Sequence, residues 1–347
     1  MARRKLLHAT GGALVALACL SGAASAQDPQ VTLRFSHWSP PQHPMSTIAV
    51  PGWVNAVEKA SNGSIKIQVF PAQQLGKAID HYDMARDGLA DITWINAGFQ
   101  PGRFPILQAL EMPWLYADPQ RMMLAFDEWY RPWVEKEMKD VKVCQLQNLF
   151  PAILHTKREV KSLPDFKALK VRVANSTQSR YLATLGSVII PVPATEARDA
   201  IEKGVADSIL FPWRSLMIFG LDNALTYHMD APFSGNGFEL ILNRNSYNRL
   251  TANQKKAIDD HCTAEWAQRF MAAWNKQEDD GRGELKAKAG HVVYPLSPQF
   301  HNELRAAAEV VRKEWAEGAR KAGYDPDQVW NSLIGAVRKH KADQPPS

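Results

Sequence analysis

The segment 169–215 constrains the fold of this chain most strongly. A strand around Arg172, a helix, a second strand, another helix and a third strand ending at Phe211 follow one another within it. Gly186 and Gly204 mark the ends of the two helices. Strict alternation of strands and helices predicts an α/β fold with a parallel sheet. The ligand crevice of such a sheet lies at the carboxyl ends of its strands.

Arg172 is the candidate binding residue of this segment. The valines on either side of it alternate with the arginine, so a strand here turns Arg172 to the opposite face. Arg172 and the Phe211–Trp213 corner both lie at strand ends, and an arginine among aromatic rings suits an organic carboxylate. The alternative is an edge-strand arginine that is solvated or paired with Asp165 or Asp207.

The N-terminus is typical of a signal peptide. Residues 3–5 are basic, residues 13–20 are apolar, and the A-x-A sequence at 24–26 predicts cleavage after Ala26. The mature chain is then expected in the periplasm, with enough residues for two domains. Removing the leader takes away three positive charges, so the net charge falls from +5 to +2. That balance does not favour nucleic acid as a partner.

Two α/β lobes are predicted. Residues 31–95 repeat the strand and helix alternation, and the strand at 141–149 leads to a crossing near Pro151. The expected first lobe comprises residues 27–150 with about 236–280, and the second comprises residues 151–235 with about 281–347.

A long helical segment begins after Thr251 and continues to about Ala289. A helix of that length exceeds one small domain, so it is expected to run alongside both lobes. The alternative is two helices broken at Gly281-Arg282-Gly283. Terminal helices are expected at 298–320 and 326–340.

Cys144 and Cys262 are the cysteines that remain after removal of the leader. In an exported chain they can form a disulfide. They are far apart in sequence, however, and neither belongs to a spacing motif. Two free buried thiols are therefore the main expectation, and a disulfide is the alternative.

No catalytic or cofactor motif supports an enzyme. The sequence lacks GxSxG, SxxK, HExxH, CxxC, GxGxxG and GxxxxGK. His37 and His43 bracket a proline-rich loop, but two histidines form no zinc site without further ligands. We therefore expect no enzymatic activity, no cofactor and no metal.

Several short motifs are spread over both predicted lobes. They are GLADI at 88–92, PGRFP at 101–105, SLPDFKALKVRV at 162–173, PVP at 191–193 before Glu196, and AIEKGVAD at 200–207. Together they resemble the substrate-binding proteins of TRAP (tripartite ATP-independent periplasmic) transporters, the DctP-like family. The resemblance covers nearly all of the mature chain. Ala168 and Ser208 depart from it, because the family usually has glycine at both positions.

The resemblance implies a periplasmic binding protein with two lobes, joined by crossing strands and a long helix. Such proteins close around a small organic acid and deliver it to TRAP membrane subunits. The family's strand-end arginine, here Arg172, binds the ligand carboxylate through a salt bridge. Further candidate ligand contacts lie at or near strand ends: Trp38, Trp94, Asn96, Arg158, Phe211, Trp213, Phe233 and Asn236.

An aromatic corner at Phe211 and Trp213 stands where the family often places a polar contact. It predicts a less polar ligand, namely an aromatic, branched or keto acid. The alternatives are that these rings only fill the interface between the lobes, or that the ligand is a C4-dicarboxylate or a sugar acid. A periplasmic enzyme or a sensor that docks to a receptor remain alternative functions of the same fold.

Overall fold

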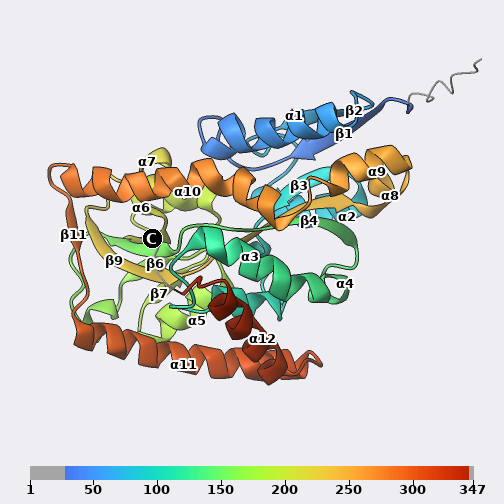
Figure 1. The fold of residues 1–347 in the computed structure, drawn as a ribbon. Helices are drawn as coiled ribbons and strands as arrows, with labels where there is room; N and C mark the ends of the chain where they lie inside the picture. The colour runs from blue at the N-terminus through green and yellow to red at the C-terminus, as the bar shows by residue number, and fades with distance from the viewer. Residues whose placement is uncertain (1–27, 344–347) are drawn as a thin grey trace, which may run out of the picture.

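The computed structural model describes residues 28–343, and the predicted signal peptide lies outside them. Two mixed sheets form the body of the molecule (Figure 1). The first sheet has the order β2-β1-β3-β10-β4, with β1 (Val31–Ser36), β2 (Ile65–Phe70), β3 (Ile92–Ile95), β4 (Val141–Asn148) and β10 (Gly237–Asn243). The second has the order β11-β9-β5-β8-β6-β7, with β5 (Ala152–Thr156), β6 (Lys170–Arg172), β7 (Val188–Ile190), β8 (Ser208–Phe211), β9 (Tyr227–Ser234) and β11 (Val292–Tyr294).

Helices cover both sheets. The α-helices are α1 (Val50–Ala60), α2 (His81–Asp87), α3 (Pro119–Tyr130), α4 (Val134–Glu137), α5 (Ser176–Thr184), α6 (Ala197–Glu202), α7 (Trp213–Ile218), α8 (Arg244–Asn248), α9 (Ala252–Asp259), α10 (Ala264–Ala287), α11 (Pro298–Lys321) and α12 (Pro326–Lys339). Shorter helical turns are η1 (Met45–Ala49), η2 (Ala78–Asp80), η3 (Ala97–Phe99), η4 (Leu107–Glu111), η5 (Arg131–Trp133), η6 (Leu163–Phe166) and η7 (Ala194–Glu196).

The predicted α/β fold class is confirmed in both halves of the chain. Strand β1 pairs in parallel with β2 and β3, and β6 pairs in parallel with β7 and β8. Because β7 is the edge strand, β6 and its Arg172 lie one strand further in. The ends of β1, β3, β6 and β8 provide the side chains described below.

Two short connections join the sheets, one in each direction. Residues 149–151 join β4 to β5, and residues 235–236 return the chain from β9 to β10. The predicted lobe boundaries at 150/151 and 235/236 fall within these two connections. Both of them lie next to the candidate site.

The helical segment after Thr251 is divided, but not at the predicted glycines. It breaks at residues 260–263, between α9 and α10, and α10 then continues through Gly281 and Gly283. A Cβ on Gly281 would lie 2.6 Å from the backbone nitrogen of Arg214. The glycine therefore permits close packing of α10 on the start of α7, and it does not break the helix.

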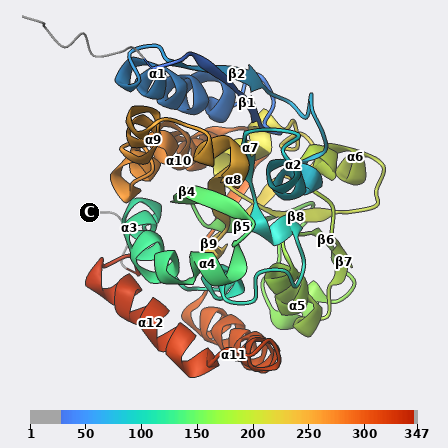
Figure 2. The same ribbon diagram turned by 90° about the vertical axis from the view of Figure 1, so that its right-hand side faces the viewer.

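Helix α10 runs along both lobes, as expected. It packs against α3 and β4 of the first lobe and against α7 and β11 of the second. Figure 1 shows it crossing the top of the second sheet and reaching the first. The terminal helices also contact both lobes, because α11 packs on α5 whereas α12 packs on α3 (Figure 2).

The expectation of two free thiols is wrong. Cys144 and Cys262 form a disulfide, with their Cα atoms 4.4 Å apart and a separation of 118 positions in the sequence. Cys144 lies in β4, and Cys262 lies in the break between α9 and α10. Their proximity depends on the packing of a helical layer on the first sheet, which no local spacing motif encodes.

Candidate functional site

A cavity lies between the two sheets, at their strand ends. Five of the predicted site residues line it, namely Trp38, Asn96, Arg172, Phe211 and Asn236. The other lining residues are His43, Phe99, Leu149, Ala174, Ala194, Leu210, Pro212, Ser215, Phe219, Phe238 and Trp274. The lining is thus mainly aromatic and apolar.

Arg172 is the charged group of the cavity. The residue is only 1% exposed, its Nε donates to the carbonyl of Val192 at 2.8 Å, and its Nη2 has no partner among the described residues. No described acid pairs with it, so neither Asp165 nor Asp207 is its partner. Burial lowers the pKa of Arg172 to about 9, which leaves the guanidinium charged at neutral pH. A buried cation without a counter-ion is costly, and a ligand carboxylate would offset that cost.

Neighbouring polar groups hold the strand that carries Arg172. The carboxylate of Asp207 accepts from the backbone nitrogen of Lys170 at 2.9 Å, and the hydroxyl of Ser208 donates to the Lys170 carbonyl at 2.9 Å. These contacts fix β6 on β8. Ala168, just before the strand, has φ of 61°, a conformation that favours glycine. This explains why glycine is the residue expected there.

The first wall of the cavity is a stack of aromatic rings from the first lobe. Trp38 stacks on Trp94 with ring centroids 4.8 Å apart, and Trp94 stacks on Phe238 at 4.7 Å. Trp38 and Phe238 line the cavity, whereas Trp94 is fully buried behind them and donates to Gln147 at 2.8 Å. The wall therefore offers flat apolar surface, suited to an aromatic ligand body.

The second wall comes from the second lobe and carries Arg172. The ring centroid of Phe211 lies 5.6 Å from the guanidinium carbon, and Phe219 packs edge-on against Phe211 at 5.3 Å. Trp213 does not line the cavity. It lies behind this corner, with its ring 5.5 Å from that of His155. It therefore supports Phe211 and is not positioned as a direct contact.

Two amide side chains sit between the walls. Asn96 accepts from the backbone nitrogen of Gly98 at 2.9 Å, and Asn236 accepts from Asn175 at 3.2 Å. Neither amide nitrogen, of Asn96 or of Asn236, donates to a described residue. Both are available as hydrogen-bond donors to a ligand oxygen.

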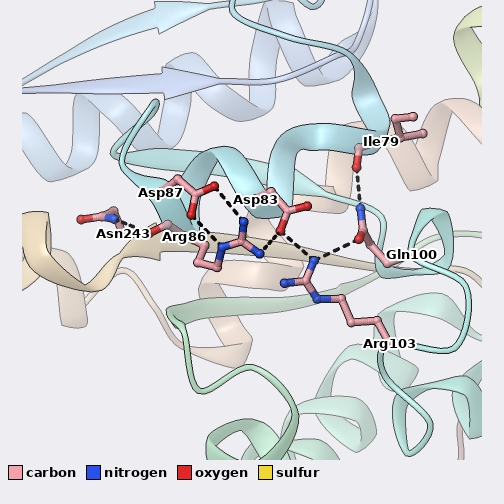
Figure 3. Close-up of polar contacts among 7 residues, drawn as sticks. All are labelled: Ile79, Asp83, Arg86, Asp87, Gln100, Arg103 and Asn243. Atoms are coloured by element: carbon pink, nitrogen blue, oxygen red, sulfur yellow. Dashed lines mark hydrogen bonds and ion pairs between the residues drawn. The ribbon is translucent and has the colours of Figure 1, made fainter.

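The loop that carries Asn96 and Phe99 is fastened to α2 by the polar network drawn in Figure 3. Gln100 donates to the carbonyl of Ile79 at 2.5 Å, and Arg103 donates to Asp83 at 2.8 Å. The guanidinium of Arg103 also lies 3.9 Å from the centroid of the Tyr82 ring. The PGRFP motif thus has a structural role, because it anchors the loop that delivers two cavity residues.

A buried carboxyl group lies at the seam between the lobes, close to this loop. Glu111 is 4% exposed, its Oε2 has no described partner, and a Cβ on Gly98 would lie 2.7 Å from its Oε1. Burial raises the pKa of Glu111 to about 8, in opposition to hydrogen bonding by Thr177 and the charge of Arg180. Glu111 is therefore mostly protonated at neutral pH and adds little negative charge near the cleft.

Two predicted residues lie away from the cavity. Phe233 is fully buried and packs on Trp114, with ring centroids 5.0 Å apart. Arg158 is half-exposed, and its Nη2 donates to the backbone carbonyl of Asp165 at 2.7 Å. Both residues were predicted near strand ends, but tertiary packing directs their side chains away from the cavity.

Several cavity residues were not anticipated as ligand contacts. His43 and Phe99 lie shortly after the ends of β1 and β3, a position at which ligand contacts could have been predicted. Ser215 and Trp274 lie on helices and Phe219 directly follows α7, where no local pattern distinguishes a cavity residue from a core residue. Among residues 28–343, no group of three or more histidine, cysteine or acidic side chains is arranged to hold a metal ion. In the same range, no helix is both long and apolar enough to cross a membrane.

Comparisons with known proteins agree with this architecture. The model of the family described as bacterial extracellular solute-binding protein, family 7, matches residues 35–318. A curated solute-binding protein of Verminephrobacter eiseniae is 25% identical over 313 residues, covering 82% of this chain and 89% of that protein.

Two solved structures are similar to this chain over nearly its whole length. A marine metagenome TRAP solute-binding protein, specific for aromatic acid ligands and crystallised with 3-hydroxybenzoate, has a TM-score of 0.85 and 29% identity. A TRAP solute-binding protein of Rhodoferax ferrireducens T118, with copurified benzoate, has the same TM-score and 27% identity. Each comparison covers 90% of this chain and 99% of the other.

Proposed function

We propose that this chain, which belongs to family 7 of the bacterial extracellular solute-binding proteins, captures an aromatic monocarboxylate for a TRAP transporter. The family prediction made from the sequence is thereby confirmed. The partners of such a protein are a small organic acid and the membrane subunits of the transporter. Binding would shift an equilibrium between open and closed lobes, and the closed form is the one that the membrane subunits recognise.

One observation carries the choice of ligand. A single buried guanidinium without a counter-ion lies in a cavity whose other walls are aromatic. A carboxylate would pair with Arg172, and the rings of Trp38 and Phe211, which both line the cavity, would contact an aromatic ligand body. The benzoate and 3-hydroxybenzoate bound to the two similar structures support this ligand class.

The same geometry argues against the two alternative ligands. A C4-dicarboxylate needs a second cation, but Arg158 lies elsewhere and His43, which lines the cavity, has its pKa lowered to about 3 by burial. A sugar acid needs a polar partner for each hydroxyl, and the lining offers few. Binding without turnover is further supported by the matched proteins, which are solute-binding proteins and not enzymes.

Titration calorimetry of the mature protein tests the proposal. We expect benzoate to bind at one site with about micromolar affinity, near −8 kcal/mol. Succinate and glucuronate should bind at least 100-fold more weakly, and the benzoate should be recovered unchanged. Tight binding of succinate or glucuronate without binding of benzoate would overturn the proposed ligand class. Conversion of the ligand would overturn the binding role.

A further inference from the structure

The cavity has a second polar end, distinct from the one at Arg172. From Arg172 of the second lobe, contacts lead through Phe211 and Phe219 to His43 of the first lobe. Successive neighbours lie 5.6, 5.3 and 6.3 Å apart, measured to ring centroids. His43 also packs edge-on against Trp274, at 4.4 Å. Two phenylalanine rings thus connect the guanidinium to the imidazole, and both polar groups line the same cavity.

The protonation of His43 is defined by its surroundings. The residue is 1% exposed, and its Nδ1 accepts from the backbone nitrogen of Met45 at 3.1 Å. Because burial keeps the imidazole neutral at pH 7, the proton must lie on Nε2. No described residue accepts from Nε2, and His43 lines the cavity. This end of the cavity therefore contains a neutral N–H donor.

Ser215 complements that donor. Its hydroxyl donates to the carboxylate of Glu278, and it accepts from the indole nitrogen of Trp274 at 3.2 Å. Glu278 also receives hydrogen bonds from the backbone nitrogen of Arg214 and from Trp274, at 2.5 and 2.7 Å. Burial raises the pKa of Glu278 to about 7, but the neighbouring N–H groups all donate to it, which favours the ionised form. With that carboxylate as the acceptor of its proton, the Ser215 oxygen keeps one lone pair for a ligand donor.

From this pairing we infer that His43 and Ser215 recognise a hydroxyl group on the ligand ring, at the end remote from its carboxylate. A hydroxyl accepts one hydrogen bond and donates another, and the two side chains supply the matching donor and acceptor. The preferred ligand is then a hydroxylated aromatic acid with its hydroxyl at the meta or para position. This inference rests on the proposed function, because Arg172 must hold the carboxylate.

The test compares benzoate with its three monohydroxy isomers by calorimetry. We expect 3- or 4-hydroxybenzoate to bind at least tenfold more tightly than benzoate. The 2-hydroxy isomer should show no such gain, because its hydroxyl lies beside the carboxylate. If all three isomers bind within twofold of benzoate, the inference is wrong while the proposed function stands. If no aromatic acid binds, both fail.

Two variants of His43 distinguish the role of Nδ1 as an acceptor from the role of Nε2–H as a donor. In His43→Asn, the amide oxygen replaces Nδ1 as acceptor for Met45, whereas the Nε2–H donor is lost. In His43→Gln, a distal N–H is retained. The ratio of benzoate Kd to hydroxybenzoate Kd should fall to about one in His43→Asn and stay high in His43→Gln. Ser215→Ala should lower the same ratio by removing the acceptor. An unchanged ratio in both His43→Asn and Ser215→Ala, each shown to be folded by its Tm, would overturn the assignment.

Discussion

The two walls of the cavity differ in how they treat charge. The second wall keeps a buried guanidinium ionised without a protein counter-ion. The first wall presents stacked neutral rings, and Glu111, the buried acid beside its loop, is mostly protonated at neutral pH. If that carboxyl were ionised, it would offer a competing negative charge near the cleft. Under the proposed function, anion capture and shape selection would be divided between the two lobes.

The first lobe also contains the disulfide. Removing it should change the free energy of unfolding by more than any other substitution changes stability or binding. Replacing Cys144 and Cys262 with alanine should lower the free energy of unfolding by about 4 kcal/mol, because the bond constrains a long loop in the unfolded chain. Urea unfolding under non-reducing conditions measures this loss. Benzoate affinity of the folded variant should stay at the wild-type value. A loss below about 1 kcal/mol would show that the cross-link does not stabilise the first lobe.

Removing the cation of the second wall should affect binding most. Arg172→Ala should weaken benzoate binding about 100-fold, and Arg172→Lys at least tenfold, because an ammonium group cannot form two parallel bonds to a carboxylate. Arg158→Ala is the matched control, since that arginine lies outside the cavity. Calorimetry checks all three variants. Equal affinities for Arg172→Ala and Arg158→Ala would remove the carboxylate site from the second wall.

The pH dependence of stability tests whether Glu111 in the first lobe is protonated in the folded protein. Its pKa is about 8 in the folded protein against 4.5 as a free group, so the folded state holds an extra proton between these values. Stability therefore falls as the pH rises from 4.5 through 8. Glu111→Gln removes this dependence, and its stability relative to wild type should rise by on the order of 2 kcal/mol between pH 5.5 and 7.5. Chemical unfolding at several pH values measures the difference. A stability difference between Glu111→Gln and wild type that does not vary with pH would mean that Glu111 is ionised in the folded protein.

The smallest effect concerns the aromatic rings. Trp38→Ala should weaken benzoate binding about tenfold, because the ring loses its stacking surface. Trp213→Ala should have a weaker effect, since that ring lies behind Phe211. Succinate, tested at higher concentrations, should lose less than benzoate in Trp38→Ala. Equal losses for the two acids would show that the first wall does not select for a ring.

Periodicity alone predicted most of the fold. The alternation of strands and helices from Val31 to Ile95, and again from Lys170 to Phe211, is a local property that each segment expresses in its own residues. The same alternation placed Arg172 and Asn96 at strand ends. Parallel strands end on one edge of a sheet, so these residues were predictable as neighbours of a crevice.

Long-range packing decided what the sequence left open. The pairing of Cys144 with Cys262, the close approach at Gly281 and the burial of Phe233 depend on elements far apart in the chain. His43, Ser215 and Trp274 meet at the cavity from a loop and two helices, for the same reason. Local pattern determines which way a residue faces within its own element. Only the folded arrangement determines what that face contacts, because contact depends on how the layers are placed in space.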